Sequence, residues 1–164
     1  MHGQDVRLDQ NKTHKELVRL WENQNTIDLR AEQLVQVYAG AFQAIESRCL
    51  ATLSRVTINV VIDRVLHIGS EKFQILSLIT IEPSGLSLKN LIQNIKKYKT
   101  EEIRNALSYF LVEFLTVVGN ITSDVLTASL HKKLVEVTRE SALSILEVQS
   151  LRSINSTNKK RGEE

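Results

Sequence analysis

Four histidines are the residues of this sequence best suited to bind a metal or transfer protons. His2, His14, His67 and His131 are widely separated, and no two of them have the spacing of a metal-binding motif such as HExxH. A zinc site would have to combine His67 and His131 with a carboxylate from another part of the chain. We therefore expect no metal site and no resident cofactor.

A single cysteine, Cys49, is the one thiol of the chain. It falls on the apolar face of the helix predicted around it, which is typical of a buried structural thiol. The GxSxG, P-loop and GxGxxG patterns of hydrolases, NTPases and dinucleotide-binding proteins are absent from the sequence. These observations predict that the protein is not an enzyme.

His131 stands in the segment LTASLHKKLVEV, where Lys132 and Lys133 could neutralise a phosphate group. The HxLKG and HExxxP patterns of histidine phosphotransfer and kinase dimerisation domains are absent, so the lysine pair is more simply a solvated helix face. An alternative is DNA contact by Lys132 and Lys133, in a helix pair around residues 103–137 that turns at Gly119 and Asn120. The formal charge of +2 and the aromatic content of 5% argue against a nucleic-acid partner.

Composition places the chain among globular proteins. Its 164 residues fit one domain, and 42% of them are hydrophobic. Six glycines and one proline leave few turns, which favours long helices. No apolar run approaches about 18 residues, so we expect no membrane insertion. The first sixteen residues lack the apolar core of a secretory signal, and we expect a cytoplasmic protein.

Hydrophobic periodicity predicts an all-α bundle of five or six helices. The Pro83 region, residues 75–86, is the place where a small β element is expected. Gly40 indicates a close helix contact, and Gly69 is placed to end a helix. The predicted helices, apart from the last, span residues 13–23 with Thr13 as N-cap, 29–53, 54–68, 88–98 and 100–120.

A long C-terminal helix is expected from Ser123 or Asp124 to Arg152, about 42 Å in length. Apolar residues recur along it at alternating steps of four and three, the spacing of a coiled-coil seam, with serines at two positions. We expect this seam to pair with a second copy of the chain; the alternative is a monomer whose last helix folds back over the bundle. The predicted dimer-interface residues are Leu130, Leu134, Val137, Val148 and Leu151.

The expected organisation is a flexible N-terminus (residues 1–12), a single helical domain (13–152) and a disordered tail (153–164). The function favoured by the sequence is a non-catalytic dimerisation or sensory module of a cytoplasmic signalling or regulatory protein. Its output would pass through the C-terminal helix to a downstream effector domain or protein. Besides DNA binding, the remaining alternative is a helical small-molecule-binding protein with a pocket lined by Phe110 and Phe114.

Overall fold

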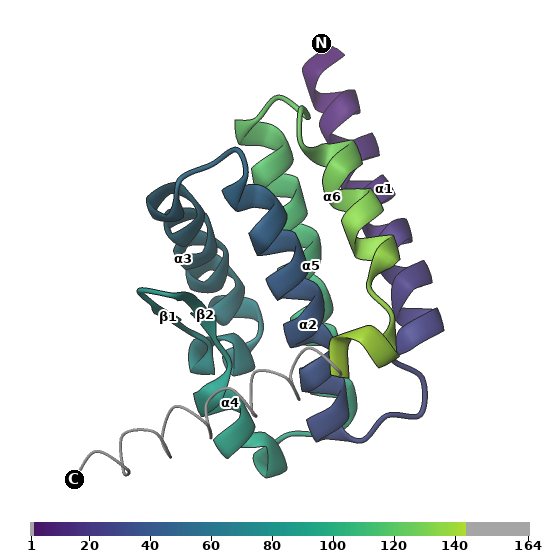
Figure 1. The fold of residues 1–164 in the computed structure, drawn as a ribbon, viewed down its shortest axis with the longest axis vertical. Coiled ribbons are helices and arrows are strands. Elements are labelled where there is room, and N and C mark those ends of the chain that lie inside the picture. The colour runs from purple at the N-terminus through teal and green to yellow at the C-terminus, as the bar shows by residue number, and fades with distance from the viewer. Residues whose placement is uncertain (1, 144–164) are drawn as a thin grey trace, which may run out of the picture.

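The computed structural model describes residues 2–143, with side chains described from residue 13 onward. A bundle of helices makes up most of it, and a small β-hairpin with short helical turns connects α3 to α5 (Figure 1). This confirms the predicted helical bundle with a minor β element. The elements are α1 (His2–Asn25), α2 (Ala31–Leu50), α3 (Arg55–Lys72), η1 (Gln74–Leu78), β1 (Thr80–Glu82), β2 (Gly85–Ser87), α4 (Lys89–Gln93), η2 (Ile95–Lys97), α5 (Thr100–Ile121) and α6 (Thr127–Glu136).

The central helix is α5, as the width of its apolar stripe predicts. It packs against α1, α2 and α3, and Figure 1 shows it lying behind α2. A helix that is buried on most of its circumference anchors the bundle, because removing its apolar surface from water is the main favourable contribution to folding. Its buried hydrophobic residues are Ile103, Ala106, Leu107, Phe110, Leu111, Val112, Phe114, Leu115 and Val118.

Helix α3 forms although its sequence is rich in β-branched residues. The Ser54 hydroxyl caps it by accepting a hydrogen bond from the Thr57 N–H at 3.1 Å. The predicted end of this helix at Gly69 is wrong, because α3 continues to Lys72. Gly69 serves close packing instead: a Cβ there would lie only 2.6 Å from Leu76 Cδ1.

Helix α1 begins at His2, so the predicted start with Thr13 as N-cap is also wrong. The polarity of the first dozen residues had predicted a flexible segment. A polar segment lacks an apolar face to bury, but it can still form a helix. This segment has no proline and several residues of good helix propensity. The helix therefore extends through residues 2–12.

The hairpin and the segment after it connect α3 to α5. Strands β1 and β2 are antiparallel, with Thr80 opposite Ser87 and Glu82 opposite Gly85. The turn between them contains Pro83, as expected for a small β element in this region. The single helix predicted over residues 88–98 is wrong, since it is divided into α4 and η2.

The predicted long C-terminal helix is wrong, because α6 ends at Glu136. Val137 has extended backbone, and its carbonyl accepts a hydrogen bond from Trp21 Nε1 at 2.8 Å. Thr138 and Ser141 then cap each other: the Thr138 N–H donates to Ser141 Oγ at 2.9 Å, and the Ser141 N–H donates to Thr138 Oγ1 at 3.1 Å. Such a reciprocal cap starts a new helical segment at residue 139.

Three of the predicted dimer-interface residues belong to the core of the protein's own fold. Leu130, Leu134 and Val137 are 1%, 0% and 5% exposed, because α6 packs against α2 within the bundle. Side chains buried in this way present no surface to a second copy, so their assignment to a dimer seam is wrong. Val148 and Leu151 lie outside the described residues, as do the rest of the predicted helix and the tail.

Candidate ligand-binding groove

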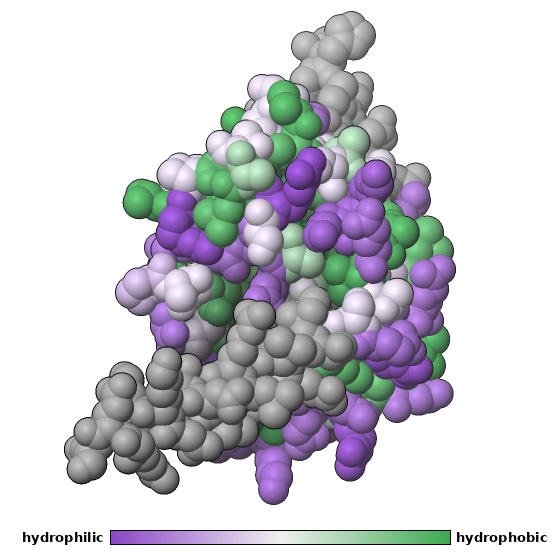
Figure 2. Space-filling view, in the orientation of Figure 1, coloured by the Kyte–Doolittle hydropathy of each residue, from purple (hydrophilic) through white to green (hydrophobic). Residues whose placement is uncertain are grey.

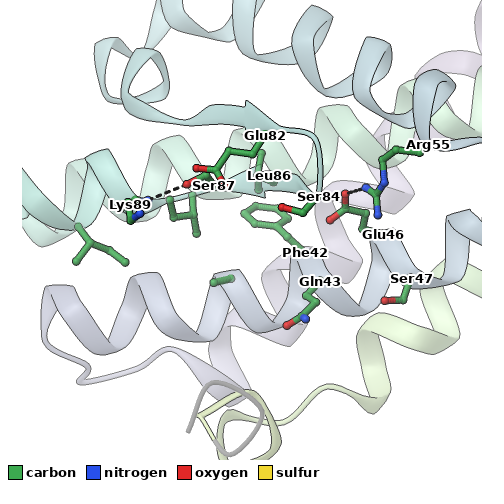
Figure 3. Close-up of a pocket in the computed structure, with 13 residues that line it drawn as sticks. Phe42, Gln43, Glu46, Ser47, Arg55, Glu82, Ser84, Leu86, Ser87 and Lys89 are labelled. Atoms are coloured by element: carbon green, nitrogen blue, oxygen red, sulfur yellow. Dashed lines mark hydrogen bonds and ion pairs between the residues drawn. The ribbon is translucent and has the colours of Figure 1, made fainter. Parts of the chain in front are cut away.

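A groove of about 550 Å³ lies between α2 and the β-hairpin (Figure 3). One wall is the face of α2 that carries Phe42, Gln43 and Glu46, and the other is formed by the hairpin and the start of α4. This volume is within the range of pockets that hold small molecules. The lining residues are Ala39, Phe42, Gln43, Glu46, Ser47, Arg55, Glu82, Ser84, Leu86, Ser87, Leu88, Lys89 and Ile92.

The floor of the groove is apolar and continues into the core. Phe42 and Leu86 line both the groove and a small apolar cavity on the core side, which Phe110 and Phe114 of α5 also line. The rings of Phe42 and Phe110 meet edge to face, with centroids 4.8 Å apart. The two phenylalanines that the sequence suggests as pocket residues therefore lie next to the groove, on the other side of Phe42.

An ion pair stands at one end of the groove. The Arg55 guanidinium, at the start of α3, binds the Glu46 carboxylate on α2 (Figure 3). These side chains are 31% and 14% exposed, so water screens their interaction less than that of a surface pair. Gly85 makes the arrangement possible, because a Cβ at this position would collide with Glu46 Oε1 and lie 3.0 Å from Arg55 Nη1.

The remaining polar groups of the groove are exposed or neutral. Glu82 and Lys89 are exposed, and neither takes part in an ion pair with another described residue. Gln43 and three serines, Ser47, Ser84 and Ser87, add neutral hydrogen-bonding groups. The groove therefore has an apolar floor and four charged side chains. Glu46 and Arg55 form the ion pair at one end, and Glu82 and Lys89 are exposed.

None of the described histidines lines the groove, and neither does Cys49. The titratable groups that line the groove are two carboxylates, a guanidinium and an ammonium group, with no imidazole or thiol among them. Cys49 lies elsewhere on α2, where burial and the nearby Glu46 raise the pKa of its thiol to about 11. A thiol with so high a pKa is a poor nucleophile at neutral pH.

The histidines are not arranged as the considered zinc site would need. His131 lies against His14 of α1, with His14 Nδ1 and His131 Nε2 2.8 Å apart, and His67 is exposed on α3. Among residues 13–143, no group of three or more His, Cys, Asp or Glu side chains is placed to hold a metal ion.

The two lysines suggested for DNA contact lie on α6. Lys132 is exposed, and Lys133 approaches Glu136 one turn later at 4.0 Å. The preceding helix of the pair is α5, which is the buried centre of the bundle. A helix in that position cannot lie across a DNA backbone as the first helix of a helix-turn-helix does, and this geometry gives the DNA-binding alternative no support.

Sequence reasoning missed the charged residues of the groove. Glu46 and Arg55 come from different helices, and no spacing rule within one helix relates them. The turn EPSG marks the hairpin in the sequence, but it does not indicate which helix the hairpin covers. The groove could be found only from where the hairpin, packed against α3, lies relative to α2.

Residues 13–143 contain no helix that is long and apolar enough to cross a membrane. Comparison with known proteins adds no further identification: no family model, curated protein or solved structure matches the chain.

Proposed function

We propose that the protein is a non-catalytic helical binding module of the sensory or regulatory kind, and that its ligand occupies the groove between α2 and the hairpin. The observation that carries this proposal is the groove itself, with about 550 Å³ of space over an apolar floor and an ion pair at one end. The proposal combines the sensory function expected from the sequence with its small-molecule alternative.

The lining indicates an amphiphilic ligand. An apolar group would bury surface against Phe42 and Leu86, at about 25 cal/mol for each Å² removed from water. A polar group at the other end would hydrogen-bond to the Arg55 or Glu46 side chain, whose shared ion pair already holds both in place. The polar part of the ligand can stay hydrated beside Glu82 and Lys89, which are exposed.

Self-association, an effector partner and a cytoplasmic location remain expectations within this proposal. The buried residues of α6 cannot supply the dimer contact. Exposed apolar side chains do occur, and Figure 2 shows apolar side chains gathered over the turn between α5 and α6. In that region Ile121 is 51% exposed and Val125 is 76% exposed.

The experiment that tests the proposal is a fragment screen against the full-length protein by thermal shift at pH 7.5, followed by NMR titration of each hit. We expect hits to combine an aromatic or branched apolar group with a carboxylate or an amine, and to perturb amides of α2 and the hairpin together. No hits, or hits whose perturbations avoid α2 and the hairpin, would contradict the proposal.

Two tryptophan variants provide a matched test of location. Gln43→Trp fills the groove from the middle of α2 and should weaken every groove ligand at least tenfold. Gln36→Trp makes the same change two turns earlier on α2, at an exposed position outside the lining, and should leave affinity within twofold of the wild type. Equal effects of the two variants would show that the ligand does not occupy the groove.

A further inference from the structure

A hydrogen bond between two imidazoles joins α1 to α6, two helices that contribute no residue to the groove. His14 Nδ1 and His131 Nε2 are 2.8 Å apart, and the rings meet edge to face at 88°. His14 is 2% exposed. Two imidazole nitrogens can share a hydrogen bond only when one carries a proton and the other offers its lone pair. The contact therefore requires that at least one ring be neutral.

The turn between α5 and α6 places a carboxylate beside this pair. Gly119 leaves room for it, since a Cβ there would lie 3.0 Å from Asp124 Oδ1 and 3.9 Å from His14 Nε2. Ser123 and Asp124 have φ values of 49° and 63°, a left-handed conformation that is unfavourable for residues other than glycine. Strain of this kind persists where the surrounding structure holds it, and it is concentrated at functional sites.

Burial favours the neutral forms of both histidines. Burial, reinforced by His131, lowers the pKa of His14 to about 4, and Asp124 opposes part of this shift. Burial also lowers the pKa of His131. His131 and Asp124 are the described groups whose charge acts on His14. Lys132, the next residue on α6, is exposed to solvent.

We propose that His14 and His131 form a proton-binding site, and that acid acts through it to release the N-terminal part of α1 from α6. A first proton can be accommodated, because the facing nitrogens still share one hydrogen. A second proton taken from solvent leaves N–H groups on both facing nitrogens, so the hydrogen bond is lost and two positive charges lie together. The separated helices bind both protons without this penalty, so falling pH favours separation.

The release is local because the C-terminal half of α1 has other attachments. Trp21 Nε1 donates to the Val137 carbonyl at 2.8 Å, and the Ser108 hydroxyl donates to Glu22 Oε1 at 2.6 Å. Among the described side chains that precede Leu17 on α1, His14 is the buried one. The histidine contact therefore is a buried attachment of the part of α1 before Val18, next to Leu17, which packs against the core, while the later contacts keep the rest in place.

The test is hydrogen exchange of the full-length protein between pH 7 and pH 4, corrected for the intrinsic exchange rates, together with the fluorescence of Trp21. We expect the amides at residues 13–17 to lose at least tenfold in protection as the pH falls. Trp21 is the single tryptophan of the chain, and its emission should stay unchanged because its attachment to Val137 survives. NMR of the two imidazole rings should show them taking up protons over the same pH range.

Two glutamine variants separate this site from general acid effects. In His131→Gln the amide can hydrogen-bond to His14 but does not take up a proton, so protection at residues 13–17 should vary less than threefold with pH. His67→Gln, at an exposed position on α3, should behave as the wild type does. If the His131→Gln protein fails to fold, the NMR titration of the wild type still decides.

Three results would overturn the proposal: protection that persists to pH 4, an acid response retained in His131→Gln, or a red shift of Trp21 emission at the same pH as the loss of protection. The last result would mean global unfolding instead of local release. The inference does not depend on the groove, and ligand binding at pH 7.5 tests the proposed function separately.

Discussion

The two sides of α2 differ in how closely they are covered. Toward the C-terminal end of the described chain, a Cβ on Gly40 would lie 2.6 Å from Ala142 Cβ, so there is no space for one more methyl group. Toward the hairpin, the same helix borders a groove of about 550 Å³. The difference shows that, among the described residues, α2 is packed closely on one side and borders a groove on the other.

The cause is the size of the covering element. Helix α6 has ten residues and inserts Leu130 and Leu134 into the core, whereas each strand of the hairpin has three residues. A two-stranded hairpin is only marginally stable by itself and needs a packing partner. Here the hairpin packs against α3, and it meets α2 through Leu86 and Gly85 beside the groove.

The largest expected effect on stability comes from placing a glutamate on the closely packed side of α2, in comparison with a glutamate on the groove side. Leu134→Glu buries a carboxylate at a position that is 0% exposed, and should cost about 4 kcal/mol or more in unfolding free energy. Leu86→Glu, on the partly exposed floor of the groove, should leave the protein folded and abolish ligand binding. Urea unfolding followed by circular dichroism measures the first effect, and NMR titration measures the second. A Leu134→Glu protein of unchanged stability would contradict the position of α6 in the core.

The sequence was sufficient to predict most of the helices, since each has its own apolar period. The wide stripe of α5, the Ser54 segment and the Pro83 hairpin region were all identified from the residues alone. The break in the last helix was not, although its cause is local. Thr138 and Ser141 have the spacing of an N-terminal helix cap. Ser141 also falls at one of the two serine positions of the predicted coiled-coil seam, and this pattern favours a continuous helix.

The candidate site was beyond sequence reasoning because it depends on long-range packing. Phe110 and Phe114 were expected to line a pocket, and the structure places them beside Phe42 at the inner side of the groove. Glu46 and Arg55 gave no signal, since their pairing depends on how α2 meets α3 and on the missing side chain at Gly85. The sequence pattern of one helix or strand does not predict the Glu46–Arg55 contact, because that contact depends on how α2, α3 and the hairpin pack together.

A second, intermediate effect is expected at Gly85, where the hairpin meets the ion pair. Gly85 has φ of 125°, which side-chain-bearing residues rarely adopt, and a Cβ would also collide with Glu46 Oε1. We expect Gly85→Ala to cost about 2 kcal/mol in unfolding free energy and to weaken groove ligands through displacement of Arg55. Ser84→Ala, in the same turn, is the control for stability and should leave the unfolding free energy nearly unchanged. If Gly85→Ala matched the wild type in chemical denaturation and in ligand affinity, the close approach of the hairpin to Glu46 would be refuted.

The smallest effect is expected at Glu22, on the closely packed side of the molecule. Burial raises the pKa of this carboxyl, although its hydrogen bond from Ser108 partly opposes the shift. The folded state therefore binds protons more tightly than the unfolded state, and the contribution of Glu22 to stability falls as the pH rises through its raised pKa. Glu22→Gln removes the charge and keeps an oxygen that can accept from Ser108. It should raise the unfolding free energy at pH 7 by about 0.5–1 kcal/mol.

The pH dependence of this gain distinguishes its cause. The advantage of Glu22→Gln over the wild type should shrink as the pH falls through the raised pKa of Glu22, because the wild-type carboxyl is then protonated as well. Glu16→Gln, at an exposed position on α1, should change stability little at either pH. A gain at Glu22 that is the same at pH 7 and pH 4 would come from packing and not from relief of a buried charge. Glu22 would then carry no electrostatic cost on the packed side.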